Sequence, residues 1–174
     1  MERLRPHGIG RIATTYGLIL GVLSFVIFLA GPVGGIRRNW VASVASAILL
    51  IVLMVLAHWN LKKSHHGMMT YAQGLGSGTL LSSIGAVLRC ILVYVYLQYF
   101  NSGYLAAVMR AQRTALERRG ITGAQAQMAM SITSALTTPV GIAVTSLVTG
   151  VVAGFIVALI VSIFTQRDDP RAVI

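Results

Sequence analysis

Four long apolar runs dominate this sequence and limit the folds that it can adopt. The runs cover about residues 13–31, 40–60, 72–101 and 139–165. At ~1.5 Å of rise per residue, a helix made from each run can cross the ~30 Å hydrocarbon core of a bilayer. The strands of a membrane β-barrel would instead alternate apolar and polar residues over about ten positions. The sequence therefore predicts a single all-α membrane domain with four transmembrane helices.

The charged residues support the same class of protein and indicate its partners. Only 10% of the residues are charged, whereas a soluble domain is usually about a quarter charged. The formal net charge is +10, and the basic residues are spread over the connections between the runs. Nucleic-acid-binding proteins concentrate such residues in one patch or stripe. We therefore expect contact with membrane lipids, including anionic headgroups, and no contact with nucleic acid.

The first two runs have the flanking residues of membrane helices. Arg3, Arg5 and Arg11 precede the first run, as in a secretory signal peptide, but the run is longer than a typical signal-peptide core. We interpret it as the first transmembrane helix. Trp40 and Trp59 flank the second run, where they suit the two interfacial aromatic belts.

Histidines at the end of the second run raise the question of a metal or haem site. His58 lies beside Trp59, and no second membrane histidine faces it, so we expect an interfacial polar residue. His65 and His66 are adjacent, but no Cys, Asp or Glu lies near them in the sequence. We therefore predict no metal site.

Residues 104–138 form a segment that is too charged to cross the membrane. Its apolar residues recur at helical spacing in two stretches, which predicts an amphipathic helical hairpin between the third and fourth spans. Gly120 is expected to end the first helix, and Thr122–Gln125 resembles a capping box that opens the second. Thr138 and Pro139 are expected to start the fourth span. We expect the hairpin to lie on the membrane surface; the alternative is a solvated helical loop. The two apolar faces comprise Leu105, Val108, Met109, Ala115 and Leu116 in the first helix and Ala124, Met128, Ile132 and Ala135 in the second.

Small residues recur at every fourth position in the third and fourth runs. Gly150 and Gly154 make a literal GxxxG motif. In lipid, close backbone contact and dispersion hold helices together, so rows of small residues favour helix packing. We expect the two rows to pack against each other within one chain, in preference to joining two copies. The members are Gly74, Gly78, Ser82, Ala86 and Cys90 in the third run and Ser146, Gly150, Gly154, Ala158 and Ser162 in the fourth.

Arg89 is a charged residue inside the third run, and no Asp or Glu lies within any of the four runs. A charge at the bilayer centre costs ~2.5–3.5 kcal/mol on insertion scales and rarely faces lipid. At 100° per residue, Arg89 shares a helical face with Ser82 and Tyr96, so we expect it to point into the bundle. The alternative is a structural arginine that extends toward the interface. The candidate partners are Ser82, Tyr96, Ser146, Thr145, backbone carbonyls, a bound anion, a lipid phosphate and a carboxylate of another chain.

Sequence motifs that carry chemistry are missing. The sequence has no Walker loop, no HExxH motif and no paired carboxylates. The single cysteine, Cys90, lies inside an apolar run, where an inert thiol is expected. We therefore expect neither an enzyme nor a bound cofactor or metal. The favoured function is a non-catalytic accessory or scaffold subunit of a larger membrane assembly, in contact with other subunits or with itself. The alternative is a small transporter or channel, for example for an anion.

The order of these features resembles one bacterial family. The Lys62–Lys63 loop, the YAQG start of the third run, its aromatic end LVYVYLQYFN, the ERRGIT segment and the small-residue final run carry the resemblance. They are similar to the four-helix membrane proteins known as domain of unknown function 4199. The resemblance covers most of the chain from Thr14 to Arg167. It implies a four-span fold and a membrane location, without an assigned activity.

An even number of spans places both termini on one side of the membrane. Cytoplasmic segments carry an excess of Lys and Arg, with most weight on short connections. We therefore expect the bacterial inner membrane, with both termini cytoplasmic. The side of the termini would carry Arg3, Arg5, Arg11, Lys62, Lys63, Arg167 and Arg171, and the other side Arg37, Arg38, Arg110, Arg113, Arg118 and Arg119.

Overall fold

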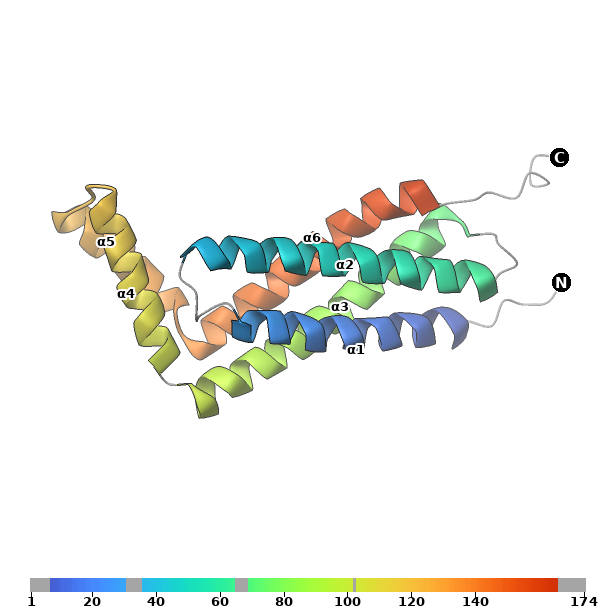
Figure 1. Cartoon of the computed structure of the whole chain (residues 1–174), viewed down its shortest axis with the longest axis horizontal. Coiled ribbons are helices and arrows are strands. Elements are labelled where there is room, and N and C mark those ends of the chain that lie inside the picture. The colour runs from blue at the N-terminus through green and yellow to red at the C-terminus, as the bar shows by residue number, and fades with distance from the viewer. Residues whose placement is uncertain (1–6, 31–35, 65–68, 102, 166–174) are drawn as a thin grey trace. The chain divides into compact units, whose positions relative to one another are not determined.

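The computed structural model describes residues 7–30, 36–64, 69–101 and 103–165 (Figure 1). Of its helices, α1, α2, α6 and the continuous pair α3 and η2 are each long and apolar enough to cross a membrane. The predicted all-α fold with four spans is therefore confirmed. Residue 31, the predicted end of the first run, and the His65–His66 pair lie outside the described residues. In chain order, the helices are α1 (His7–Ala30), α2 (Ile36–Ser64), α3 (Tyr71–Val95), the π-helix η2 (Tyr96–Phe100), α4 (Gly103–Arg118), α5 (Gly123–Leu136) and α6 (Pro139–Thr165).

The chain divides into two compact units. The four-helix unit, residues 1–89 and 147–174, contains α1, α2, most of α3 and most of α6. The hairpin unit, residues 90–146, contains the end of α3, η2, α4, α5 and the beginning of α6.

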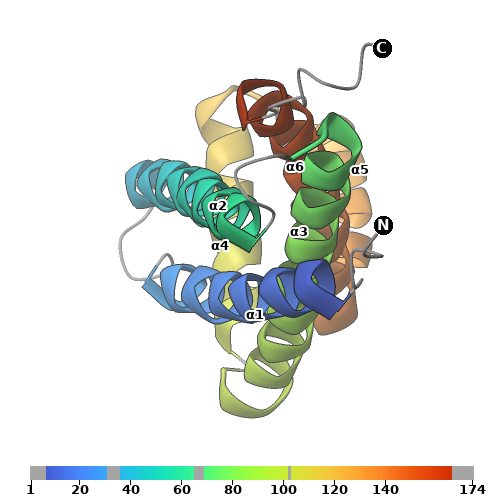
Figure 2. The same ribbon diagram turned by 90° about the vertical axis from the view of Figure 1, so that its right-hand side faces the viewer.

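Helix α3 is central to the four-helix unit. The start of α1, the end of α2, the start of α3 and the end of α6 lie at the same end of this unit (Figure 1). Helices α1 and α2 lie side by side. Seen along the helices, α3 lies between α1 and α6 (Figure 2). The unit is therefore an antiparallel bundle in which α3 has a neighbour on each of several faces.

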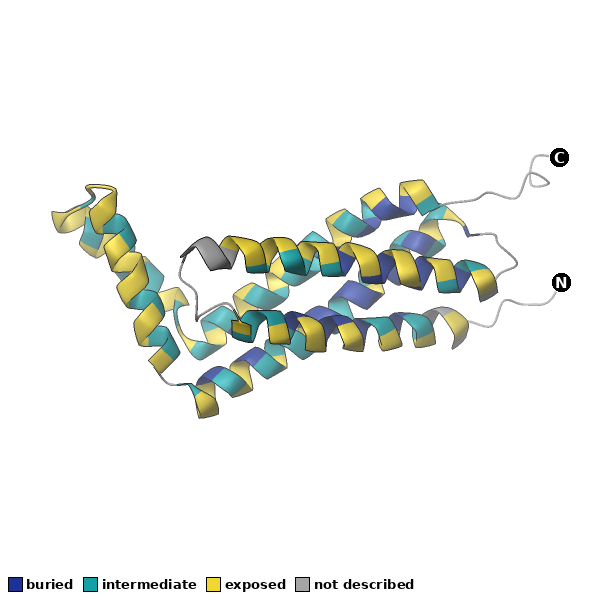
Figure 3. Ribbon diagram, viewed as in Figure 1, coloured by how far each residue is buried: buried dark blue, intermediate teal, exposed yellow. Residues whose placement is uncertain are grey.

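Apolar side chains both fill this bundle and cover it. The buried core draws on all four helices and includes Leu20, Met54, Leu81 and Ala158. The outer faces of α1 and α2 carry exposed Leu, Ile and Val side chains (Figure 3). A large exposed apolar surface is unfavourable in water but suits the acyl chains of a bilayer. The exposed apolar residues are thus the natural lipid-contacting surface.

Side-chain caps mark where α3 and α6 begin. At α3, the Gln73 N–H donates to Thr70 Oγ1 at 3.3 Å, and the Thr70 N–H donates to Gln73 Oε1 at 3.2 Å. This reciprocal pair is a capping box. At α6, the Gly141 N–H donates to Thr138 Oγ1 at 2.9 Å, and Pro139 is the first helical residue. The prediction for Thr138 and Pro139 is confirmed.

A glycine turn ends α4 in the hairpin unit. Gly120 has a φ of +72°, in the left-handed region that glycine adopts without strain. Its N–H donates to the Glu117 carbonyl at 3.0 Å, and the Ile121 N–H donates to the Leu116 carbonyl at 3.1 Å. These two bonds make a Schellman motif, so the predicted helix end at Gly120 is confirmed.

The predicted capping box at the start of α5 is wrong. Thr122 is the N-cap residue of α5, but its side chain makes no capping hydrogen bond. Gly123 follows it with a φ of +67°. Because Gly123 adopts this left-handed conformation, the chain changes direction directly after Thr122. The Thr122 hydroxyl therefore does not reach the first N–H groups of α5, which a capping box would satisfy.

The two hairpin helices expose their apolar faces to different extents. The predicted apolar residues of α4, including Leu105, Val108 and Leu116, are half-buried. On α5, Met128 and Ile132 are 70% and 60% exposed, respectively. Helices α4 and α5 pack on each other, yet Met128 and Ile132 of α5 are not covered by other described residues of the hairpin unit.

Candidate functional site

The small residues of α3 and α6 face one another, and we call this contact the α3–α6 seam. A Cβ atom placed on Gly78 would lie 2.9 Å from Ala158 Cβ, and one placed on Gly150 would lie 3.0 Å from Ala86 Cβ. The two backbones therefore approach as closely as small residues allow. Successive contacts advance by four residues along one helix and retreat by four along the other. The pairs are Gly74–Ser162, Gly78–Ala158, Ser82–Gly154 and Ala86–Gly150.

Each pair in the seam joins one glycine to one residue that has a short side chain. In the first two pairs α3 supplies the glycine, and in the last two α6 supplies it. Sliding one helix by a turn would set Gly78 against Gly154, which leaves a void, and Ala86 against Ser146, which puts a second Cβ where Gly150 now has none. Packing at this density penalises both changes. The order of small residues thus specifies the register of the seam.

The outermost members of the two predicted rows belong to the hairpin unit. They are Cys90, which is half-buried, and Ser146, whose Oγ donates to the Ala143 carbonyl at 2.7 Å. Ser146 therefore uses its hydroxyl within its own helix.

A second close contact joins α1 and α3, and it is not among the contacts expected from the sequence. A Cβ atom on Gly17 would lie 2.8 Å from the Leu81 carbonyl oxygen. One on Gly21 would lie 3.0 Å from the Gly85 carbonyl oxygen. The signal was present as a GxxxG motif, Gly17 to Gly21, in the first apolar run. Helix α3 therefore packs closely against α1 on one face and against α6 on another, in both cases through small residues.

His58 links α2 to both helices of the α3–α6 seam. It is only 1% exposed, whereas the sequence suggested an interfacial polar residue. Its Nε2 lies 3.0 Å from the Gly74 carbonyl oxygen, and its Nδ1 lies 2.9 Å from Thr165 Oγ1. Both ring nitrogens are thus engaged, and the described residues contain no cluster of three His, Cys, Asp or Glu that could hold a metal ion.

The partners of His58 determine which ring nitrogen carries hydrogen. A carbonyl oxygen only accepts, so Nε2 must donate to Gly74. The Thr165 hydroxyl has one hydrogen and lies 2.8 Å from the Val161 carbonyl as well as close to Nδ1. In a neutral ring Nδ1 is an acceptor, so the one Thr165 hydrogen, which is donated to the Val161 carbonyl, is shared between that carbonyl and Nδ1. The arrangement therefore ties the ends of α2 and α6 to the start of α3.

A buried hydroxyl lies beside this histidine contact. Ser162 is fully buried, and its Oγ has no hydrogen-bond partner among the described residues. The same Oγ faces the Cα of Gly74, where a Cβ would lie 3.0 Å away. Ser77 Oγ donates to the Gly74 carbonyl at 3.0 Å. Gly74 is consequently the point where the histidine contact and the seam meet.

Arg89 lies on α3 one turn beyond Gly85 and Ala86, the residues that contact α1 and α6. Its Nε atom is buried and has no hydrogen-bond partner among the described residues. It lies about 16 Å along the helix from Phe100, the end of the span, which places it within the hydrocarbon region.

Two of the predicted partners of Arg89 make hydrogen bonds within their own segment of the chain. Ser82 Oγ donates to the Thr79 carbonyl at 3.0 Å. Tyr96 Oη accepts a hydrogen bond from Asn101 Nδ2 at 2.9 Å. Both bonds are local to α3 and η2, and each hydroxyl oxygen keeps a lone pair that can accept a further hydrogen bond.

These features define a multi-pass helical membrane protein whose central helix is held by small-residue contacts. The model of a family described as protein of unknown function (DUF4199) matches residues 15–167, and the chain belongs to this family. The resemblance seen in the sequence is thereby confirmed. No curated protein and no solved structure matches the chain.

Proposed function

We propose that this protein is a non-catalytic accessory or scaffold subunit of a larger membrane assembly. The observation that carries the proposal is the buried, unpartnered Nε of Arg89 inside a transmembrane helix. Arg89 as a whole is half-buried, and inside the hydrocarbon region a charge without a partner is unfavourable. No Asp or Glu lies within the four spans, so a carboxylate that neutralises this arginine has to come from outside them. A second subunit with an intramembrane Asp or Glu provides one.

The packing of the four-helix unit supports a structural role. Its central helix makes close contacts through glycine on two faces, and His58 ties three helices together. Rigid, precise helix packing suits a scaffold that presents one fixed surface to a partner. The chain would lie in the bacterial cytoplasmic membrane with both termini in the cytoplasm, as the short basic connections favour.

The test compares tagged full-length wild type with Arg89→Leu, Arg89→Lys and a control, Arg118→Leu, on an exposed part of the hairpin. Each protein is expressed at native level, extracted in a mild detergent and analysed by native mass spectrometry. We expect a stoichiometric complex for wild type and Arg118→Leu, and its loss for Arg89→Leu. We expect Lys to substitute poorly because it lacks the planar fork that binds a carboxylate at two points.

Two results would overturn the proposal. The first is an Arg89→Leu variant that unfolds at a higher temperature than wild type and still co-purifies with everything the wild type does. That result would identify Arg89 as a tolerated charge whose removal only lowers an insertion cost. The second is anion flux through vesicles that contain the purified chain alone, abolished by Arg89→Leu, which would identify a transporter.

A further inference from the structure

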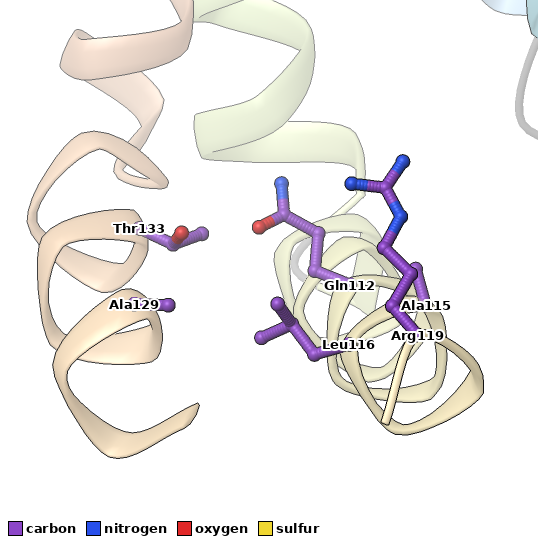
Figure 4. A pocket seen from close by; sticks show the side chains of 6 residues that line it. All are labelled: Gln112, Ala115, Leu116, Arg119, Ala129 and Thr133. Atoms are coloured by element: carbon purple, nitrogen blue, oxygen red, sulfur yellow. The ribbon is translucent and has the colours of Figure 1, made fainter. Parts of the chain in front are cut away.

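A groove between α4 and α5 has the lining of a ligand site. Its volume is about 210 Å³. Its floor is apolar, and polar side chains stand around it. Figure 4 shows Gln112 and Arg119 projecting on the same side of α4, with Thr133 on α5 facing them. The lining residues are Gln112, Ala115, Leu116, Arg119, Ala129 and Thr133.

The polar rim of this groove consists of hydrogen-bond donors. Arg119 supplies a guanidinium fork, Gln112 an amide NH₂ and Thr133 a hydroxyl. The rim contains no carboxylate. Donors of this kind, with a guanidinium among them, match a phosphate group.

The turn after α4 places Arg119 at the mouth of the groove. Arg119 is the residue between the last residue of α4 and Gly120, the left-handed residue of the Schellman motif. Its own N–H donates to the Leu116 carbonyl at 3.0 Å. The backbone that carries Arg119 is therefore fixed by hydrogen bonds on both sides, which limits the ordering cost of binding through its side chain.

The charges of the hairpin favour an anionic ligand. Residues 103–138 contain four arginines and one glutamate. Arg113 pairs with that glutamate, Glu117, at 3.3 Å, and Arg110 Nε donates to the Ala106 carbonyl. Arg118 and Arg119 make no ion pair with the described residues. Arg119 thus lines the groove with its charge uncompensated by any carboxylate of the described chain.

Exposed apolar and aromatic side chains favour a position of the hairpin unit at the level of lipid headgroups. Met128, Ile132 and Leu136 form an exposed stripe along α5. Tyr99 and Phe100, at the end of η2, are 76% and 79% exposed, respectively. Amphipathic helices with such stripes insert at the boundary between headgroups and acyl chains, and aromatic residues gather there. Phospholipid headgroups are the phosphate compounds found at that depth.

We propose that the α4–α5 groove binds the phosphodiester headgroup of an anionic phospholipid. Arg119 holds the phosphate through two N–H donors, and Gln112 and Thr133 donate to its remaining oxygens. The floor of Ala115, Leu116 and Ala129 receives the glycerol backbone, and the acyl chains follow the apolar stripe of α5 into the bilayer. The site does not depend on the assembly proposed above.

The experiment measures lipid binding to the purified full-length protein by native mass spectrometry during titration with phosphatidylglycerol, with phosphatidylcholine as the zwitterionic comparison. We expect wild type to prefer phosphatidylglycerol and Arg119→Gln to weaken its binding about tenfold, since a charge-assisted bidentate contact is lost. Arg118→Gln is the matched control, because it removes the same charge from the adjacent residue outside the groove. It should change the affinity less than about twofold.

Two further variants keep the test independent of the folding of Arg119→Gln. Thr133→Val, on the other helix, should weaken phosphatidylglycerol binding, and Arg119→Lys should bind almost as weakly as Arg119→Gln. Equal loss in Arg118→Gln and Arg119→Gln would overturn the site in favour of diffuse charge attraction. Equal binding of soluble glycerophosphoglycerol would overturn the assignment to a lipid. Equal binding of phosphatidylglycerol and phosphatidylcholine by the wild type would overturn the proposal entirely.

Discussion

Replacing Gly154 by alanine tests the α3–α6 seam with a single added carbon. A Cβ at Gly154 would overlap the Cβ and Oγ of Ser82. The Ser82 Cβ is fixed to the backbone of α3, so it cannot move aside without shifting the helix. Overpacking of this kind costs about 1–3 kcal/mol. The higher helix propensity of alanine offsets about 1 kcal/mol of this cost. The net destabilisation is therefore roughly 0–2 kcal/mol, and we expect Gly154→Ala to lie near the upper end because the Ser82 Cβ cannot move aside.

Other glycines in the same spans provide graded controls. At Gly150 the added Cβ would meet Ala86 Cβ at 3.0 Å, so Gly150→Ala should be less harmful than Gly154→Ala. At Gly76 nothing lies within 4 Å, so Gly76→Ala should be neutral or stabilising by up to about 1 kcal/mol. All three substitutions add the same atom, so their differences report only what that atom meets.

The assay is thermal unfolding of the purified full-length variants in one detergent, followed by intrinsic fluorescence. At about 2–4 °C per kcal/mol for a chain of this length, Gly154→Ala should unfold several degrees below Gly76→Ala. Ser82→Gly should rescue Gly154→Ala, because it removes the atoms that the new Cβ overlaps, and the double-mutant cycle should show favourable coupling. Equal unfolding temperatures for Gly154→Ala and Gly76→Ala, or additive effects in the cycle, would refute the seam.

The remaining predictions concern the histidine contact and the orientation in the membrane. His58→Leu should destabilise by about 1–3 kcal/mol, because it removes the hydrogen bonds to Gly74 and Thr165. Thr165→Val should add little further loss in the His58→Leu background, and full additivity in thermal unfolding would contradict the contact. For orientation, a cysteine at Thr122 in a Cys90→Ser background should react with a membrane-impermeant maleimide applied outside spheroplasts. Reaction only after lysis would place the hairpin in the cytoplasm.

The sequence was sufficient to predict the helices and several of their ends. Apolar length alone identifies a transmembrane helix, because the bilayer forces the backbone to satisfy its own hydrogen bonds. Gly120 and Thr138 are local signals, since a left-handed residue and a capping hydroxyl act within a few residues of their own position. Thr122 shows the limit of such signals. Its motif fitted a capping box, but the φ of the following Gly123 is absent from the letters of the sequence.

The sequence also contained the small residues of both close contacts of α3, and it predicted that the rows of α3 and α6 pack against each other, but it did not give the register of that packing. A row such as Gly150 and Gly154 indicates a face that can approach another helix, without indicating which residues meet there. The tertiary structure pairs that row with Ala86 and Ser82.

The burial and the hydrogen-bond partners of His58 depend entirely on the tertiary structure. In the sequence it is a polar residue at the end of an apolar run, and interfacial exposure is the ordinary expectation. The structure buries it because α3 and α6 bring the Gly74 carbonyl and the Thr165 hydroxyl to its two nitrogens. Its partners lie 16 and 107 residues away along the chain. Local sequence patterns determine which residues each helix presents on its faces, whereas contacts between residues distant in the sequence exist only once the helices have packed.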